Sequence, residues 1–308
     1  MGRRTSYLFL CACLAQHLAV SRVSGRLVTR SVQNRSFDRV AIITVPNASR
    51  HVSAKDAQSR LMREANGMIK RVIAMSLYGN DPDYLVGAIE NAVLVQRDWA
   101  GWTLRVYHDA DVPEKTLRVL HDLEVQLVPR SGAHVDDHAG LLLRFTVLQD
   151  PGVTRYLIRD ADARLTRRDK HAVDEWIESG RFFHIVRDHP SHHNEIMGGA
   201  WGAVGGFIRP AMLDAVMAST AEVPFNEDQL FLAKYVWPHV KDHALTHDAF
   251  YCESSAYRVS AWRPFPTKRA SPHDFIGNKY MRENEYVGMA IERDCPEACR
   301  GETRWRQC

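Results

Sequence analysis

The pattern of hydrophobic and polar positions changes at residue 71. From there, short apolar runs of strand length alternate with segments in which apolar residues recur at helical spacing. The apolar runs cover residues 71–77, 102–109, 125–129 and 155–160, and the helical segments cover 82–93, 114–123 and 140–150. This alternation predicts an α/β domain with a mostly parallel central sheet flanked by helices. In such a sheet, ligands bind at the carboxyl ends of the strands.

The second half of the chain is less regular. A strand is predicted over residues 181–190, and a glycine-rich bend at 198–208 leads into another apolar stretch. Helical spacing then predicts a helix over 226–240, and an apolar run predicts a strand over 243–252. No internal repeat divides these elements, so we expect them to form a single domain over residues 69–290.

The N-terminal part differs from this domain in composition. Residues 5–21 carry no charged side chain and follow a short basic start, which predicts a secretory signal cleaved after Gly25 or a retained membrane anchor over residues 1–25. Residues 26–68 are rich in Arg, Ser, Asn and Gln and predict a stem or linker, with a peripheral helix near 54–68 as the alternative for part of it. Sequons at Asn34 and Asn47 could accept N-glycans.

The cysteines and the net charge bear on the cellular compartment and on the expected partners. Four cysteines outside the predicted signal, at 252, 295, 299 and 308, predict two disulfides, and the last three lie in a C-terminal tail over 291–308. A zinc site is the alternative, but the close Cys-x-x-Cys pair typical of zinc sites is missing. The net charge of +3 is mild and no basic run is interleaved with aromatics, so nucleic acid is not an expected partner. Together these features predict the secretory pathway, either in the ER or Golgi lumen behind a membrane anchor or as a secreted protein.

Three Asp-x-Asp pairs could serve as candidate ligand sites. The pair at 81–83 is explained as a helix cap with a first-turn acid, and the pair at 109–111 leads into an ordinary helix start. Asp160 and Asp162 instead follow an apolar strand directly, and Thr166 with Asp169 forms a capping box just beyond them. Two neighbouring buried carboxylates are costly unless a cation neutralises them.

Mn²⁺ or Mg²⁺ suits oxygen ligands of this kind and leaves coordination positions for phosphate oxygens. His247, at another predicted strand end, is our first candidate for a third metal ligand, and His273 is the second. Arg159 and Arg164 flank the pair; Arg164 is a candidate cofactor-binding residue, and the alternative role of both is to neutralise the acids in an ion-pair network.

With these residues in view, the chain resembles the GT-A type glycosyltransferases, in particular a group with RDxDSR, RDHP, GGxWG and EDQ tracts. The matching tracts are Arg159–Arg164, Arg187–Pro190, Gly198–Gly202, residues 76–92 and residues 225–238. Together these tracts extend the resemblance over roughly residues 70–290. Ala163 replaces the usual Ser after the second Asp, which removes a hydroxyl but neither of the two carboxylates.

The resemblance implies a GT-A, Rossmann-like fold and a role for each tract. The first strand end would contact the nucleotide of a nucleotide-diphospho-sugar donor through Ser76, Leu77 and Tyr78. Asp160 and Asp162 would hold the metal and the diphosphate, while Gly198, Gly199 and Trp201 would line the donor-sugar and acceptor cleft. Trp201 could instead be a core aromatic.

The resemblance also points to an acid at the start of the predicted helix 226–240. Asp228 would act as the catalytic acid or base, with Glu227 as the second candidate. As a first-turn acid of that helix, Asp228 would need no catalytic role. Asp188 and His189 could meet the sugar, or could form a plain turn with Pro190.

The resulting prediction is a metal-dependent glycosyltransferase that transfers a sugar from a nucleotide sugar to a glycan, protein or lipid acceptor. A phosphohydrolase with an Asp-x-Asp pair is a rival enzyme, but such enzymes place the pair after the first strand, with Thr where this chain has Arg164. A secreted carbohydrate-binding or adhesion module is the non-enzymatic rival. It would explain the predicted signal, the sequons and the cysteines, but not the carboxylate, glycine and Glu-Asp-Gln tracts together.

Overall fold

An eight-stranded sheet is the centre of the computed structural model, which describes residues 52–130, 140–213, 227–257, 259, 261–280 and 290–308. The strand order is β3-β2-β1-β4-β6-β5-β7-β8. The strands are β1 (Arg71–Leu77), β2 (Trp102–His108), β3 (Gln126–Pro129), β4 (Arg155–Arg159), β5 (Phe183–Arg187), β6 (Ala200–Val204), β7 (Ala244–Asp248) and β8 (Ala261–Arg263).

All strand pairs are parallel except the two made by β6, which runs antiparallel to both β4 and β5. The predicted mostly parallel sheet is therefore confirmed. Since β4 and β5 both oppose β6, they run in the same direction. The carboxyl ends of β1, β4, β5 and β7 consequently share one edge of the sheet.

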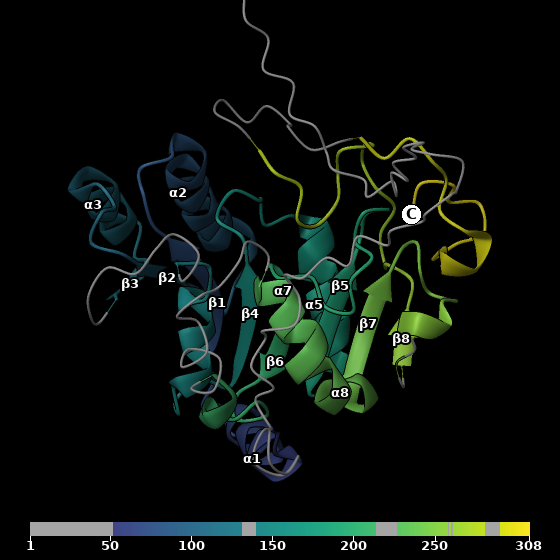
Figure 1. Cartoon of the computed structure of the whole chain (residues 1–308), viewed down its shortest axis with the longest axis horizontal. Helices are drawn as coiled ribbons and strands as arrows, with labels where there is room; N and C mark the ends of the chain where they lie inside the picture. The colour runs from purple at the N-terminus through teal and green to yellow at the C-terminus, as the bar shows by residue number, and fades with distance from the viewer. Residues whose placement is uncertain (1–51, 131–139, 214–226, 258, 260, 281–289) are drawn as a thin grey trace, which may run out of the picture. The chain divides into compact units, whose positions relative to one another are not determined.

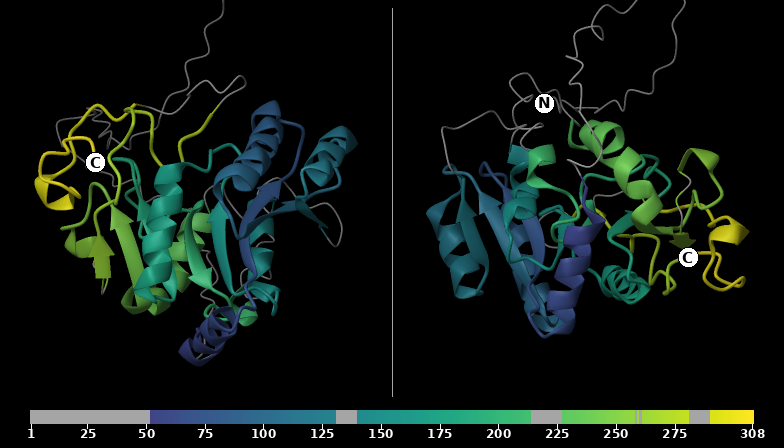
Figure 2. Two further views of the ribbon diagram at one scale, coloured as in Figure 1. Left: turned by 180° about the vertical axis from the view of Figure 1, so that it is seen from behind. Right: turned by 90° about the horizontal axis from the view of Figure 1, so that it is seen from below.

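Helices cover the two faces of this sheet. Figures 1 and 2 show α5 on one face and the segment from α7 to α8 on the other. The α-helices are α1 (Ala54–Ala65), α2 (Pro82–Asp98), α3 (Glu114–Asp122), α5 (Arg167–Ser179), α7 (Glu227–Phe231) and α8 (Trp237–Val240), and a π-helical segment, Leu232–Val236, joins the last two. Short 3₁₀ segments are η2 (Leu143–Gln149), η5 (Lys241–His243), η6 (Ser255–Tyr257) and η8 (Glu297–Cys299). The helix expected over 140–150 is thus mostly a 3₁₀ segment.

Helix α1 precedes the sheet and is bound to two of its strands. The chain divides into a unit of residues 1–45 and one of residues 46–308, and every described residue belongs to the second. Ser53 caps α1 by accepting a hydrogen bond from Asp56 N, and Glu64 near its end pairs with Arg71 at 2.6 Å and Arg155 at 2.8 Å. The helix alternative for part of the stem is therefore the one observed. The predicted signal or anchor, the rest of the stem and both sequons lie outside the described residues.

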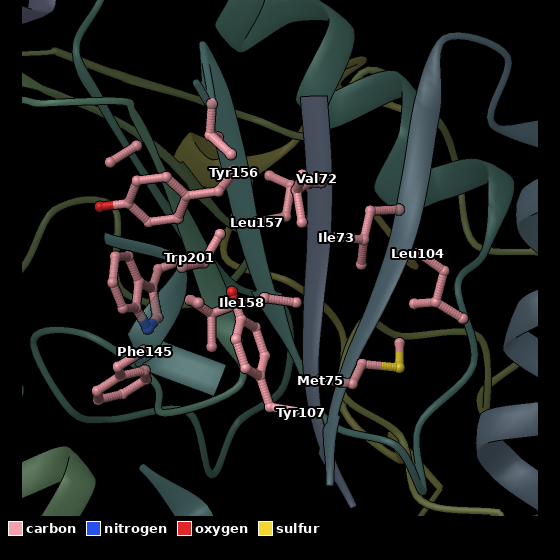
Figure 3. Packing of buried hydrophobic residues seen from close by; sticks show 14 of the residues in the cluster. Val72, Ile73, Met75, Leu104, Tyr107, Phe145, Tyr156, Leu157, Ile158 and Trp201 are labelled. Carbon is pink, nitrogen blue, oxygen red and sulfur yellow. The ribbon is translucent and has the colours of Figure 1, made fainter. Parts of the chain in front are cut away.

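The core contains a group of large aromatic side chains around Trp201 (Figure 3). The Trp201 ring lies 5.4 Å from that of Phe145, 5.8 Å from Tyr156 and 5.3 Å from Phe183, centroid to centroid. Only 1% of Trp201 is exposed. The structure therefore places Trp201 in the core and not in the ligand cleft, because its position on the central strand β6 points it under the segment from α7 to α8.

The two predicted disulfides are present and join Cys252 to Cys299 and Cys295 to Cys308. With all four sulfurs used, the zinc alternative is excluded. In the part of the chain that the structure describes, no helix has the length and apolar character needed to cross a membrane.

The ion pair between Arg159 and Asp169 provides a test of this fold. Its two bonds measure 2.8 and 2.7 Å and both side chains are almost fully buried. We expect Asp169→Asn to lower the free energy of unfolding by about 3–5 kcal/mol, because it leaves a buried guanidinium without its counter-charge. Asp174→Asn, on the same helix, removes a pair whose acid is 43% exposed, and should cost about 0.5 kcal/mol or less. Urea denaturation under non-reducing conditions measures both, and equal losses would contradict this assignment.

Candidate active site

Three carboxylates converge on one open cleft at the shared strand edge. Asp160 and Asp162 come from the loop after β4, and Asp228 comes from the first turn of α7. The side chains of Asp162 and Asp228 are mostly buried, while that of Asp160 is about one third exposed. Other residues that line the cleft are Ser76, Tyr78, Tyr84, Arg144, His192, Met197, Gly198, Gly199, Gln229, Gly277 and Lys279.

Helix α2 holds the loop that carries the two aspartates. The buried Asn91 amide donates to Ala161 O at 3.3 Å and Ala163 O at 2.8 Å, and its oxygen accepts from Leu165 N at 3.0 Å. Gly87 lets α2 approach closely, because a Cβ there would overlap Ala161 O. The loop therefore has a fixed shape that owes little to the carboxylates themselves.

Arg144 links two of the carboxylates. Its guanidinium is buried, forms an ion pair with Asp160, and contacts Asp228 Oδ2 at 3.2 Å. Ser76 positions this arginine, since its hydroxyl accepts from Arg144 N at 2.9 Å and donates to Leu141 O at 3.2 Å. Arg144 thus supplies one positive charge between two acids that come from separate parts of the chain.

The two glycines of the GGxWG tract make room for these carboxylates. A Cβ at Gly199 would overlap the Asp160 carboxylate, and a Cβ at Gly198 would overlap that of Asp228. The resemblance implied that both glycines line the cleft, and the structure places them there. Their immediate role is to let backbone and carboxylate lie in contact.

The electrostatics of the cleft favour an added cation. Burial, and then the charge of Asp160, raises the pKa of Asp162 to about 6, although Lys279 Nζ lies 3.6 Å from its carboxylate. Tyr84 also donates a hydrogen bond to Asp162. Burial likewise raises the pKa of Asp228, against the lowering effect of Arg144. The positive groups in the cleft therefore offset these negative charges only in part.

The residues fit a divalent cation that is shared with a ligand. No group of three His, Cys, Asp or Glu side chains that could hold a metal ion occurs among the residues that the structure describes. Mg²⁺ sites are commonly made of one or two carboxylates completed by substrate phosphates, with the same oxygen ligands suiting Mn²⁺. Asp160 and Asp162 match that pattern and do not make an all-protein cage.

The structure does not bring His247 to this pair. His247 lies in β7, separated from β4 by β6 and β5, and both ring nitrogens are engaged inside the protein. Its Nδ1 lies 2.8 Å from His184 Nε2, and its Nε2 lies 2.9 Å from Glu175 Oε2. The sequence placed it correctly at a strand end but could not give the strand order. The second candidate, His273, does not line the cleft either.

Leu77, Arg164, Arg159 and Asp188, four other residues considered for the site, have structural contacts. Leu77 is buried in the core, whereas Ser76 and Tyr78 beside it do line the cleft. Arg164 directs its guanidinium to Ala163 O and over the Tyr280 ring and does not line the cleft, and Arg159 pairs with Asp169. Asp188 is buried between Arg168 and Arg269. Glu227 begins α7, and its side chain lies outside the described part of the structure.

The remaining Asp-x-Asp pairs have structural roles. Asp81 accepts from Asp83 N as the cap of α2, which confirms the predicted helix cap. Asp109 pairs with Arg130 at 3.0 Å, and Asp111 accepts from Gly79 N at 2.9 Å. Only the pair after β4 shares the cleft with Asp228.

Several site residues were not identified from the sequence: Tyr84, Arg144, His192 and Lys279 line the cleft, and Asn91 holds the aspartate loop. His192 is buried, and its Nδ1 accepts from Asp188 N at 3.1 Å, which leaves the proton of the neutral ring on Nε2. Burial lowers its pKa to about 4. His192 is thus a neutral hydrogen-bond donor at the cleft.

Comparisons with known proteins give no match to a protein-family model or to a curated sequence. Solved structures that match include residues 1–349 of TarS from S. aureus, with 12% identity, a TM-score of 0.36, and coverage of 53% of this chain and 54% of that one. A mannosyltransferase from Pyrobaculum calidifontis, in complex with GDP-Man and Mn²⁺, matches with 13% identity, a TM-score of 0.38 and 63% coverage of each chain. The chain thus spans between about half and under two thirds of these two structures. At such low similarity, the functional interpretation depends on the site itself.

Asn91 provides a direct test of how the aspartate loop is held. We expect Asn91→Leu to lower the free energy of unfolding by about 2–4 kcal/mol, because it leaves buried backbone groups of residues 161–165 without partners. Gln96→Leu is the matched control on the same helix, where the side chain donates one exposed bond to Leu123 O, and it should cost about 0.5 kcal/mol or less. Thermal unfolding of the two variants gives the comparison. An Asn91→Leu protein as stable as the control would contradict the assigned role.

Proposed function

We propose that this protein is a metal-dependent glycosyltransferase that moves a sugar from a nucleoside diphosphate sugar to an acceptor hydroxyl. The observation that supports this most is the convergence of Asp160, Asp162 and Asp228 on one cleft, with Arg144 and Lys279 as the nearby cations. Such a cleft offers ligands for a cation, donors for phosphate oxygens and a separate carboxylate for proton transfer. It lies at the carboxyl ends of parallel strands, where sheets of this kind bind ligands.

Asp160 and Asp162 would hold the divalent cation together with the diphosphate. When bound, the cation offsets the charge that develops on the departing nucleoside diphosphate. Lys279, whose side chain is 41% exposed, lies where it can reach a phosphate oxygen from the rim. His192 can donate its Nε2 proton to a ligand oxygen without adding charge.

Asp228 is the residue we assign to the acceptor. Burial raises the pKa of its carboxyl, which makes the ionised form a better proton acceptor. Its Oδ1 accepts from Gln229 N at 2.8 Å and its Oδ2 contacts Arg144, so the carboxylate is held in one orientation. In this assignment the acceptor hydroxyl would transfer its proton to Asp228 as its oxygen bonds to the anomeric carbon of the donor sugar, and the bond from that carbon to the diphosphate oxygen would break, with the electron pair leaving on the nucleoside diphosphate.

Two features support a place in the secretory pathway. The disulfides Cys252–Cys299 and Cys295–Cys308 are of the kind that persists in an oxidising compartment. The uncharged segment of residues 5–21 is suited to a signal or an anchor. The non-enzymatic rival, a carbohydrate-binding module, would have no need for three carboxylates in one cleft with a buried arginine between two of them.

Substitution of Asp162 tests the cation site. We expect Asp162→Asn to reduce Mn²⁺-dependent hydrolysis of nucleotide sugars, screened over UDP and GDP donors, by about 10²–10³-fold, because it removes one of two charged ligands. The fold should be retained, since Asn keeps the shape of a side chain whose charge burial disfavours. Asp174→Asn, exposed on α5, is the matched control and should keep full activity. Activity of Asp162→Asn equal to the control would exclude a cation role for this pair.

Substitution of Arg144 tests whether two acids depend on one guanidinium. We expect Arg144→Lys to lower turnover by about 10²-fold, because an ammonium group cannot span Asp160 and Asp228 as a planar guanidinium does. Arg97→Lys, which changes an exposed side chain on α2, is the control and should leave turnover unchanged. Steady-state kinetics with the best donor, alongside circular dichroism, checks both variants. Full turnover of Arg144→Lys would show that the bridge has no part in the reaction.

A further inference from the structure

A second hollow, here called the outer pocket, opens at the same edge of the sheet. It is lined chiefly by Arg187, Asp248, Tyr251, Glu253, Tyr257 and Trp262. Arg187 ends β5 and Asp248 ends β7, and both strands run in the same direction as β4, which leads to the candidate active site. The two hollows are therefore on one side of the domain.

The segment of residues 188–198, between β5 and β6, separates the two hollows. On the side of the outer pocket, the Tyr251 hydroxyl donates to Pro190 O, the Tyr257 hydroxyl donates to His193 O, and Arg187 donates to Glu195 O at 2.8 Å. The same segment contributes His192, Met197 and Gly198 to the candidate active site. A ligand in the outer pocket would thus lie one loop away from the cleft.

The floor of the outer pocket is rigid and internally neutral. Arg187 and Asp248 form a buried ion pair at 2.6 Å, and Asp248 also accepts from Phe250 N and Tyr251 N. The Arg187 guanidinium lies 4.9 Å from the centre of the Tyr257 ring. With its charge matched in this way, Arg187 is poorly suited to recruit an anion such as a phosphate.

The rim combines an exposed aromatic face with exposed polar groups. Trp262, on the edge strand β8, is 40% exposed and is the only aromatic ring among the large exposed hydrophobic residues in the described part of the chain. Glu253 is exposed in the same lining, and Ser254 is half-buried there. Pyranose rings have apolar C–H faces and hydroxyl-bearing edges, so an aromatic face beside carboxylate and hydroxyl acceptors matches both.

We propose that the outer pocket binds a pyranose ring of a saccharide acceptor, with Trp262 stacked on the sugar face and Glu253 accepting hydrogen bonds from its hydroxyls. That the bound saccharide is the acceptor of a transfer rests on the proposed function. A pocket of this chemistry suits a glycan better than a lipid or a peptide as the molecule that receives the sugar.

Saturation-transfer difference NMR on the full chain tests this proposal, with the methyl glycosides of glucose, galactose, mannose and N-acetylglucosamine as probes. At least one probe should bind, and Trp262→Ala should weaken its binding by about tenfold. Glu253→Gln, an exposed and nearly isosteric change, should weaken it less but measurably. Met62→Ala removes an even more exposed apolar side chain on α1 and should leave binding unchanged.

Two results would overturn the proposal: no binding of any of the four probes, or equal binding by Trp262→Ala and the unmodified protein. The assay needs neither donor nor metal, so its outcome is independent of the candidate active site. If the unmodified protein binds a saccharide but does not hydrolyse any nucleotide sugar, the proposed function alone is rejected. Intact donor hydrolysis without saccharide binding would reject the outer pocket alone.

Discussion

The repulsion among Asp160, Asp162 and Asp228 is the constraint around which this edge of the sheet is organised. Carboxylates this close are costly in a partly buried cleft unless opposite charge is supplied. Arg144 lies between Asp160 and Asp228, and Lys279 reaches Asp162 from the rim. The raised pKa values of Asp162 and Asp228 indicate that this compensation is incomplete. A bound cation would offset more of this negative charge. Binding of the cation with its diphosphate would therefore also change the stability of the fold.

Buried ion pairs also fix the loops that surround the cleft. Arg159 with Asp169 holds the start of α5 to β4, and Asp188 accepts bonds from both Arg168 and Arg269. These pairs lie directly beyond the carboxyl ends of β4 and β5. A buried charge left without its partner would strongly destabilise the folded protein. Each pair therefore favours the one loop position in which both of its charges meet. The candidate active site therefore rests on a second layer of charge that does not itself face the cleft.

Much of the sheet could be predicted from the sequence, because buried parallel strands give short apolar runs with clear ends. Asp160 and Asp162 stood out by the same logic, since they directly follow such a run. Arg144 could not be found in this way, because it lies in a 3₁₀ segment whose partners are distant in sequence. His247 was assigned to the cleft because a strand end was visible but the order of the strands was not. Trp201 shows the same limit, since a glycine-rich tract gives no information on which neighbours point into the core.

We propose that Asp160 and Asp162 bind a divalent cation and a nucleoside diphosphate as one unit. The most direct measurement is a calorimetric titration of Mn²⁺ into the protein with and without UDP or GDP. We expect weak binding of Mn²⁺ alone and binding at least about tenfold tighter with one of the two diphosphates, with both effects lost in Asp160→Asn. Binding of Mn²⁺ that does not respond to either nucleotide, or that persists unchanged in Asp160→Asn, would contradict it.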